Sequence, residues 1–138
     1  MHYHPDINKK DYKFFNLKIC KAFLYENYII TEFNEGVDIN FENFKELSKI
    51  IEESFKNEPF GFIANRVNSY SINLNDAALF NKTFPNAIAY AIVAYSPRTE
   101  RIIEIENYFF KFNKKVFRNF ENAITWVEST LIEKQVDN

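Results

Sequence analysis

Hydrophobic and polar residues follow two different periods along the chain, and each period predicts a set of elements. Residues 17–25 and 28–33 are rich in β-branched and aromatic side chains, and the turn Glu26-Asn27 between them predicts an antiparallel hairpin. Residues 59–67 and 87–95 form two further apolar runs of strand length. The second run is apolar throughout, which is typical of a central parallel strand that is buried on both faces.

Two segments between these strands have a helical period. Residues 40–57 carry apolar side chains at spacings of three and four, which predicts an amphipathic helix. Asn40 is its predicted N-cap, because an asparagine side chain can accept a hydrogen bond from a free N–H of the first turn. Residues 73–84 predict a short helix, in which Asn73 and Asp76 resemble a capping box.

Residues 96–112 allow two interpretations. A serine followed by a proline is typical of a helix start, and apolar residues continue at helical spacing. The same stretch also alternates as a strand would, and we favour the helix. Residues 114–117 then predict a short edge strand, and residues 119–134 predict a final helix with one apolar face. The apolar stripe predicted for the helix over residues 96–112 consists of Ile102, Ile105, Phe109 and Phe112.

The order of these elements indicates an α/β sandwich: a small mixed sheet, opened by an antiparallel hairpin, with about four helices. The chain has 138 residues, of which 46% are hydrophobic, so it can bury the core of one domain without a disulfide or a metal. We place that domain at residues 17–138. Residues 1–16 are polar and lack a period, which predicts a flexible N-terminal arm.

Charge and composition exclude several classes of protein. A net charge of −2 argues against a nucleic-acid binder, which usually has a strongly basic face. No apolar run reaches the roughly 20 residues of a membrane span, and the first residues lack the apolar core of a signal peptide. The single cysteine, Cys20, excludes an internal disulfide and fits a reducing compartment, so we expect a cytoplasmic protein.

The residues that common catalytic and cofactor sites require are scarce. The only histidines, His2 and His4, lie in the predicted arm, where they are poorly placed to activate a nucleophile or to hold a metal. The only glycines are Gly36 and Gly61, which excludes the glycine-rich loops that bind phosphates and dinucleotides. We therefore expect no catalytic residue, no metal and no cofactor.

The segment RVNSYSIN, residues 66–73, is the main candidate for a binding site. It follows an apolar strand, and ligands of open α/β sheets bind at the carboxyl ends of strands. The candidate interaction or switch loop consists of Asn65, Arg66, Asn68, Ser69, Tyr70 and Ser71. A structural interpretation is that Ser71 or Asn73 caps the next helix while Tyr70 packs on its surface. A third interpretation is an enzyme that uses Arg66 with a nearby carboxylate.

A second candidate site is aromatic. Four aromatic residues stand close together near the end of the third predicted helix, and they cannot all face one core. Tyr108, Phe109 and Phe112 are predicted to border an apolar groove, which would suit a small apolar ligand or a lipid. The alternative is that this segment is packed between the sheet and the last helix.

Two stretches of the sequence carry a resemblance. The closing VFRNFENAITWVEST has Phe117 and Phe120, followed by an acid-x-Ala-Ile-x-Trp pattern in residues 121–126. The opening residues 23–47 run from a hairpin into a helix. Over about residues 17–133 the chain resembles the SpoIIAA-like, STAS-type domain superfamily. The resemblance implies a small mixed sheet with helices packed against it. Members of this superfamily include regulators that bind partner proteins, and related domains bind lipids or other apolar ligands.

In the anti-sigma-factor antagonists of this superfamily, a kinase phosphorylates a serine where a central strand meets a helix. Ser71, or else Ser69, corresponds to that position, although the pattern Asp-Ser-Ser-Gly or Asp-Ser-Thr-Gly is replaced here by Asn-Ser-Tyr-Ser. Our first hypothesis is therefore a non-enzymatic regulatory or protein-interaction domain with an unidentified protein partner. The alternative is a carrier of a small molecule or lipid with an apolar pocket. The oligomeric state is left open.

Overall fold

The structure is a computed structural model that describes residues 2–5 and 11–136. A six-stranded sheet has the order β1-β2-β3-β5-β7-β8, in which β1, β2 and β3 are antiparallel and β3, β5, β7 and β8 run parallel. Its strands are β1 (Lys13–Asn16), β2 (Cys20–Leu24), β3 (Tyr28–Phe33), β5 (Phe60–Arg66), β7 (Ala87–Ala94) and β8 (Lys114–Phe117). A separate parallel pair consists of β4 (Asp38–Ile39) and β6 (Ser71–Ile72).

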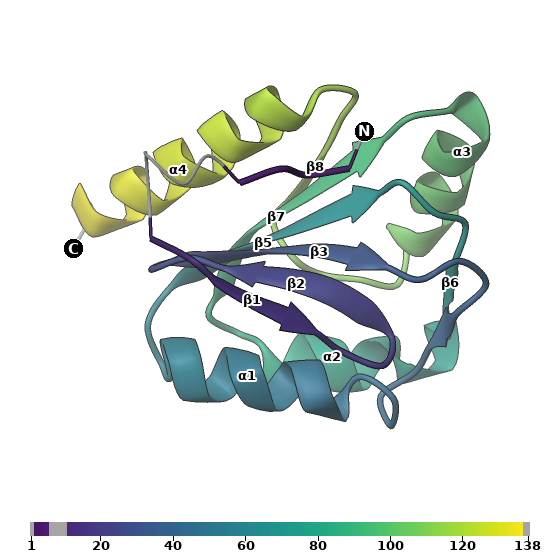
Figure 1. Ribbon diagram of the computed structural model, residues 1–138, viewed down its shortest axis with the longest axis horizontal. Coiled ribbons are helices and arrows are strands. Elements are labelled where there is room, and N and C mark those ends of the chain that lie inside the picture. Colours follow the sequence, from purple (N-terminus) through teal and green to yellow (C-terminus); the bar gives the residue numbers. More distant parts are fainter. Residues whose placement is uncertain (1, 6–10, 137–138) are drawn as a thin grey trace.

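Helices cover both faces of the large sheet (Figure 1). They are α1 (Lys45–Phe55), the 3-10 helix η1 (Leu74–Asp76), α2 (Ala77–Thr83), α3 (Pro97–Glu106) and α4 (Phe120–Val136). Helices α1 and α2 pack on one face and α4 on the other, and α3 buries Ile103 against Ile92 and Ala94 of β7. The predicted fold class, a mixed sheet opened by a hairpin with α-helices on it, is confirmed.

The strand β7 lies at the centre of the parallel part, between β5 and β8. The prediction of a strand buried on both faces is confirmed for it, because Ile92, Val93 and Ala94 are at most 2% exposed. The hairpin of β2 and β3 is confirmed too, and it is closed by a hydrogen bond from the Tyr25 N–H to the Tyr28 carbonyl.

The N-terminal residues are more ordered than the prediction of an arm over residues 1–16. Residues 13–16 form β1, which extends the hairpin by pairing with β2, with Phe15 opposite Ala22. Farther toward the start, the Tyr3 ring stacks on Phe120 of α4 at 4.9 Å between centroids. A four-residue strand has too short a pattern to identify, and its partner edge exists only once β2 is folded. Residues 6–10 of the expected arm lie outside the described residues.

The structure confirms one of the two predicted helix-start motifs that begin with an asparagine. Asn40 and Asn43 exchange hydrogen bonds, each side-chain oxygen accepting from the other's N–H, so Asn40 caps the turn that precedes α1. The predicted capping box of Asn73 and Asp76 is wrong. Asn73 caps η1 by accepting from the Asn75 N–H at 3.0 Å, whereas Asp76 accepts from the Phe41 N–H at 2.8 Å. The Phe41 N–H, which lies just before α1, reaches Asp76 only in the folded protein.

The third helix is confirmed over residues 97–106, where the Ser96 hydroxyl accepts from the Thr99 N–H at 3.2 Å. Its predicted stripe is wrong, because Ile103 is the buried isoleucine and Ile105 is 57% exposed. The helix ends at Glu106 rather than continuing to residue 112. Ending there rotates the following aromatic residues away from the stripe that a longer helix would have produced.

Gly61 permits the close packing of α4 on the sheet. A Cβ at this position would lie 2.3 Å from Cγ1 of Val127 and 3.3 Å from Cβ of Tyr28. Val127 is fully buried together with Ala123. Small residues on both elements therefore bring the helix and β5 into direct contact, which leaves bulky aromatic side chains to fill the opposite face.

Candidate functional site

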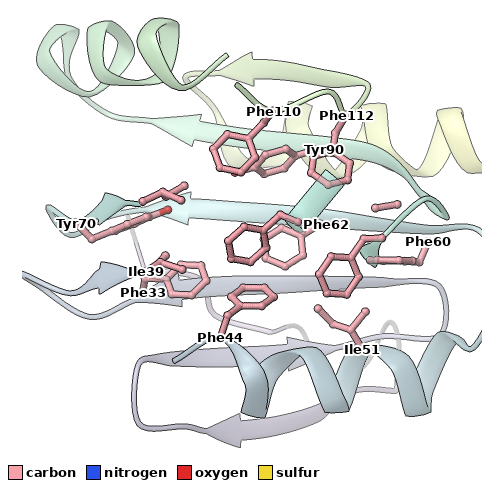
Figure 2. A pocket seen from close by; sticks show the side chains of 14 residues that line it. Phe33, Ile39, Phe44, Ile51, Phe60, Phe62, Tyr70, Tyr90, Phe110 and Phe112 are labelled. Atoms are coloured by element: carbon pink, nitrogen blue, oxygen red, sulfur yellow. The ribbon is translucent and has the colours of Figure 1, made fainter. Parts of the chain in front are cut away.

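An apolar cavity lies between the sheet and the α1/α2 layer (Figure 2). Its volume is about 80 Å³, and it is partly open to solvent. Side chains from the strands, both helices and the segment after α3 contribute to it. The lining residues are Phe33, Ile39, Phe44, Ile51, Phe60, Phe62, Tyr70, Ile72, Phe80, Phe84, Ala87, Tyr90, Phe110 and Phe112.

The cavity follows from how aromatic rings meet on this face of the sheet. Phe62 and Tyr90 are register partners on β5 and β7, so both side chains point toward the helices, and their rings meet edge to face at 5.7 Å. Phe112 meets Tyr90 in the same way at 6.1 Å. Rigid rings in T-shaped contacts leave space between them that aliphatic side chains would fill. Ala87 leaves further room at the start of β7.

The predicted loop is divided between the two faces of the sheet. Asn65 lies on the α4 side, where its Nδ2 donates to Oε2 of Glu32 at 2.8 Å and its Oδ1 accepts from the Tyr95 hydroxyl at 2.6 Å. The Tyr3 N–H donates to the same carboxylate oxygen at 2.6 Å, and Nδ1 of His2 lies 2.9 Å from Oε1. Asn65 therefore belongs to a buried network that the N-terminal residues complete, away from the cavity.

Arg66 lies on the cavity side and is buried. Its Nη1 donates to Oε1 of Glu106 at 2.7 Å, and its Nη2 donates to the Tyr70 carbonyl at 3.1 Å. The guanidinium carbon is 4.2 Å from the centre of the Tyr70 ring. Among the described residues, Nε of Arg66 is the buried side-chain atom without a hydrogen-bond partner. The carboxylate that an enzymatic interpretation requires is thus present, but the two charges neutralise each other out of contact with water.

The other residues of the candidate loop make local hydrogen bonds or face solvent. Asn68 donates to the Phe33 carbonyl at 2.9 Å, and the Ser69 N–H donates to Oε2 of Glu35 at 2.8 Å. Ser71 begins β6 and is exposed, and its hydroxyl donates to Oδ1 of Asp38 at 2.7 Å. Asn73, rather than Ser71, is the helix cap. A phosphate on Ser71 would therefore meet a carboxylate at β4, since Arg66 is directed inward.

Tyr70 differs from its neighbours because it is 8% exposed and lines the cavity. Burial raises the pKa of its phenol, and the nearby Glu106 carboxylate adds to this while Arg66 opposes it. Burial likewise raises the pKa of Tyr90, with Tyr70 and Glu106 as further causes. Both phenols are therefore neutral at physiological pH and can each donate and accept a hydrogen bond.

The predicted groove residues separate in the structure. Phe112 lines the cavity, whereas Tyr108 is 79% exposed and Phe109 is 44% exposed. Phe110, which the sequence prediction of a groove omits, is 7% exposed and lines the cavity beside Phe112. The break of α3 at Glu106 produces this alternation, because beyond the helix successive side chains point in different directions.

Other groups of interest lie away from the cavity opening. Cys20 is fully buried, and burial raises the pKa of its thiol to about 12, with the Glu46 carboxylate as a smaller cause. Within residues 2–5 and 11–136, no three histidine, cysteine, aspartate or glutamate side chains are grouped so that they could hold a metal ion. In that same part of the chain, no helix combines the length and the apolar character that crossing a bilayer requires.

Sequence reasoning missed Glu106 as the counterion of Arg66. As lining of the cavity it missed Tyr90, Phe44, Phe80 and Phe84. Glu106 reads as one acid among several on an exposed helix, and Tyr90 as one apolar position in a central strand. The signal that was available is the aromatic content itself, with 16 Phe and 8 Tyr in 138 residues. Only the fold shows that these rings converge.

Comparison with known proteins identifies the fold. No protein-family model matches the chain, and no curated protein matches it by sequence. Among solved structures, the chain is similar to an uncharacterised protein of the DUF3478 family with a SpoIIAA-like fold, from Shewanella loihica PV-4. The two share 14% identity with a TM-score of 0.53, over 85% of this chain and 92% of that one. The chain therefore has a SpoIIAA-like fold, as its opening and closing motifs predict.

Proposed function

We propose that the protein binds a small apolar ligand in the cavity between the sheet and helices α1 and α2, and acts as a carrier domain of SpoIIAA-like fold. The observation that carries the proposal is the cavity of about 80 Å³, whose lining is almost entirely aromatic and aliphatic. Apolar cavities in proteins stay dry and take up apolar molecules such as benzene or xenon. An unfilled space of this kind weakens a core, because the side chains that line it lack contacts. An apolar ligand would supply those contacts.

The size of the cavity restricts the ligand. An engineered cavity of roughly 150 Å³ holds one benzene molecule. A cavity of about 80 Å³ accommodates a short alkyl segment, and a longer chain has to extend through the side that is open to solvent. The ligand class that fits is therefore a slender aliphatic molecule rather than a fused ring system.

A substitution that fills the cavity tests this proposal. Ala87 lines the cavity, so Ala87→Leu should occupy the space without removing any existing contact. Ala78→Leu is the matched control, because Ala78 is exposed on the neighbouring helix α2. We expect n-pentane to raise the melting temperature of the wild type and of Ala78→Leu, and to leave that of Ala87→Leu unchanged.

Native mass spectrometry and solvent extraction of the purified chain provide a second measurement. An aliphatic molecule should accompany the wild type and Ala78→Leu but not Ala87→Leu. If n-pentane stabilises none of the three proteins, or stabilises Ala87→Leu as much as the wild type, the proposal is wrong.

A second candidate function is the binding of a partner protein, as in regulators of STAS type. The observation that favours it is a set of exposed apolar side chains at the end of α3, where Ile105 is 57%, Tyr108 is 79% and Phe109 is 44% exposed. Large aromatic side chains are enriched at the centres of protein interfaces. This set of side chains does not include Ser69 or Ser71.

A photo-crosslinking amino acid at position 108 tests the second candidate. Position 132 is the control, because Ile132 is 60% exposed on α4, at the other face of the sheet. We expect one protein to be captured reproducibly at position 108 and not at position 132, and Ile105→Ala should weaken that capture. Equal capture at both positions would show that the α3 end is not a specific interface.

A further inference from the structure

Part of the cavity wall has an irregular backbone. Residues 107–113 connect α3 to β8 through turns, and two of their rings, Phe110 and Phe112, line the cavity. Most of the other lining side chains lie in strands and helices, whose backbone hydrogen bonds fix their positions. Figure 2 shows Phe110 and Phe112 with Tyr90 on one side of the cavity. Irregular segments open locally at a lower free energy than central strands, so on this side the 107–113 segment opens more easily than β7.

Both ends of the 107–113 segment are fixed to the sheet. At its start, Nζ of Lys114 in β8 donates to the Asn107 carbonyl at 3.2 Å and also to the Phe110 carbonyl. At its end, Nδ2 of Asn113 donates to the Ile88 carbonyl of β7 at 3.0 Å. A segment that is held at both ends moves about those ends.

The middle of the segment is held to α2 by one side chain. Nδ2 of Asn81 donates to the Phe109 carbonyl at 3.0 Å, and Oδ1 of Asn81 accepts from the Lys111 N–H at 2.9 Å. In the described part of the chain, these are the hydrogen bonds that join α2 to the segment. They bracket Phe110, whose ring lies 6.1 Å from that of Phe80, the residue before Asn81. Asn81 thereby holds Phe110 in the cavity wall.

The two Asn81 bonds can break without leaving unpaired buried groups. Both bonds are exposed to solvent, so water can take the place of either partner. The ring contact of Phe110 with Phe80 then remains as the direct contact between α2 and the segment in this part of the wall. The junction of α2 with residues 107–113 is therefore a place where the wall can open.

We propose that residues 107–113 form a flap through which the apolar ligand enters the cavity, and that Asn81 is its latch. Release of the two Asn81 bonds lets Phe110 move away from Phe80, which opens the cavity between α2 and the flap. The cavity is narrow, at about 80 Å³, so an alkyl chain passes more readily when this wall moves. The inference rests on the proposed apolar-ligand function and adds the entry route and the residue that controls it.

The binding kinetics of n-pentane on the intact chain test the flap, by NMR line-shape analysis of the backbone amides. Asn81→Ala removes both latch bonds, and alanine favours the helix in which residue 81 lies. We expect association and dissociation each to accelerate about tenfold in Asn81→Ala. The Kd should change less than about threefold, because the latch is closed in both the free and the ligand-bound protein.

Asn86→Ala is the matched control. The Asn86 side chain also makes two hydrogen bonds to the backbone, donating to the carbonyls of Lys56 and Glu58, but these residues are outside the cavity lining. Both rates of n-pentane binding should stay within about twofold of the wild type in this variant.

Amide hydrogen exchange of the ligand-free protein measures the opening itself. The Phe109 and Phe110 amides donate to the Glu106 carbonyl at 3.0 and 3.2 Å. They should exchange about tenfold faster in Asn81→Ala and at the wild-type rate in Asn86→Ala. A role of Asn81 within α2 alone would instead accelerate exchange at the Phe84 amide, which donates to the Phe80 carbonyl.

The results separate this inference from the proposed function. If n-pentane binds the wild type but Asn81→Ala changes neither its rates nor the exchange of the flap amides, the flap is wrong and the apolar-ligand function stands. If Asn81→Ala weakens binding without faster association, Asn81 shapes the occupied cavity and the entry route is wrong. If n-pentane binds none of the three proteins, both proposals are wrong.

Discussion

Nη1 of Arg66 lies 2.7 Å from Oε1 of Glu106, although the two residues are 40 positions apart in the sequence. The pair joins the end of β5 to the end of α3, and the same guanidinium donates to the Tyr70 carbonyl and stacks on the Tyr70 ring. One buried cation therefore connects β5, the Tyr70 backbone and the end of α3. The position of Tyr70 depends on that connection.

The stability of the protein should depend on the two charges together. Arg66→Met or Glu106→Gln alone leaves one buried charge without its partner, which we expect to lower the free energy of unfolding by about 3–5 kcal/mol. The double variant should lose less than the sum of the two, with a coupling of about 1–3 kcal/mol in urea denaturation. Strictly additive losses would contradict a direct interaction between the two side chains.

Gly61 should be intolerant of even one added methyl group. Gly61→Ala places a Cβ 2.3 Å from Cγ1 of Val127, so we expect α4 to shift and the free energy of unfolding to fall by about 1–3 kcal/mol. Removing the clash in Gly61→Ala/Val127→Ala should make the substitution at position 61 nearly neutral relative to Val127→Ala alone. Urea unfolding of the four proteins measures this. If the cost of Gly61→Ala is the same in both backgrounds, the Val127 contact is not its cause.

Glu32 should hold the N-terminal residues on the sheet. It is 4% exposed, and it accepts hydrogen bonds from the Tyr3 N–H and the Asn65 side chain. Glu32→Gln should lower the free energy of unfolding by about 1.5–3 kcal/mol, because hydrogen bonds to a charged acceptor are lost. Hydrogen exchange at the Tyr3 amide should accelerate, because its acceptor is weakened.

Glu35→Gln is the matched control for Glu32→Gln. Glu35 is exposed and accepts from the Ser69 N–H, so the change should stay within about 0.5 kcal/mol and leave the Tyr3 amide unaffected. Equal effects of the two substitutions would mean that burial of Glu32 contributes nothing to the docking of the N-terminal residues.

Cys20 should make stability fall at alkaline pH. Burial raises its pKa from 9.0 to about 12, so the unfolded chain loses the thiol proton at a lower pH than the folded chain. The stabilisation is complete below pH 9.0 and decreases as the pH rises toward about 12. Between pH 9.0 and about pH 11, wild type should lose up to about 1.4 kcal/mol per pH unit more than Cys20→Ala.

Urea denaturation at a series of pH values gives the two slopes for the Cys20 comparison. The buried tyrosines act in the same direction in both proteins, so the difference between the slopes reports on the thiol and on its smaller effect on the pKa of Tyr70. Identical slopes for the wild type and Cys20→Ala would show that this thiol titrates alike in the folded and unfolded states.

Local patterns in the sequence were sufficient for most elements. The hairpin, the central strand over residues 87–94 and the final helix each have a period and a length that belong to one kind of structure. Short elements were harder, as the strand at residues 13–16 shows. Its four residues form a strand because β2 offers them an edge, which is a property of the folded sheet rather than of those residues.

The candidate site, like the fold, could be predicted from the sequence only in part. That polar residues gather at the end of the β5 strand was evident from the chain, but the directions of their side chains were not. Asn65 and Arg66 are neighbours that point to opposite faces, so one joins the Glu32 network and the other joins Glu106 beside the cavity.

The fold class follows from the order of periodic segments along the chain, because periodicity is a local property that each segment carries alone. The cavity belongs to the tertiary structure. Phe62 and Tyr90 meet only through the parallel register of β5 and β7, and Arg66 finds its counterion only where α3 ends. Contacts between residues so far apart in the chain depend on packing, which a linear pattern does not specify.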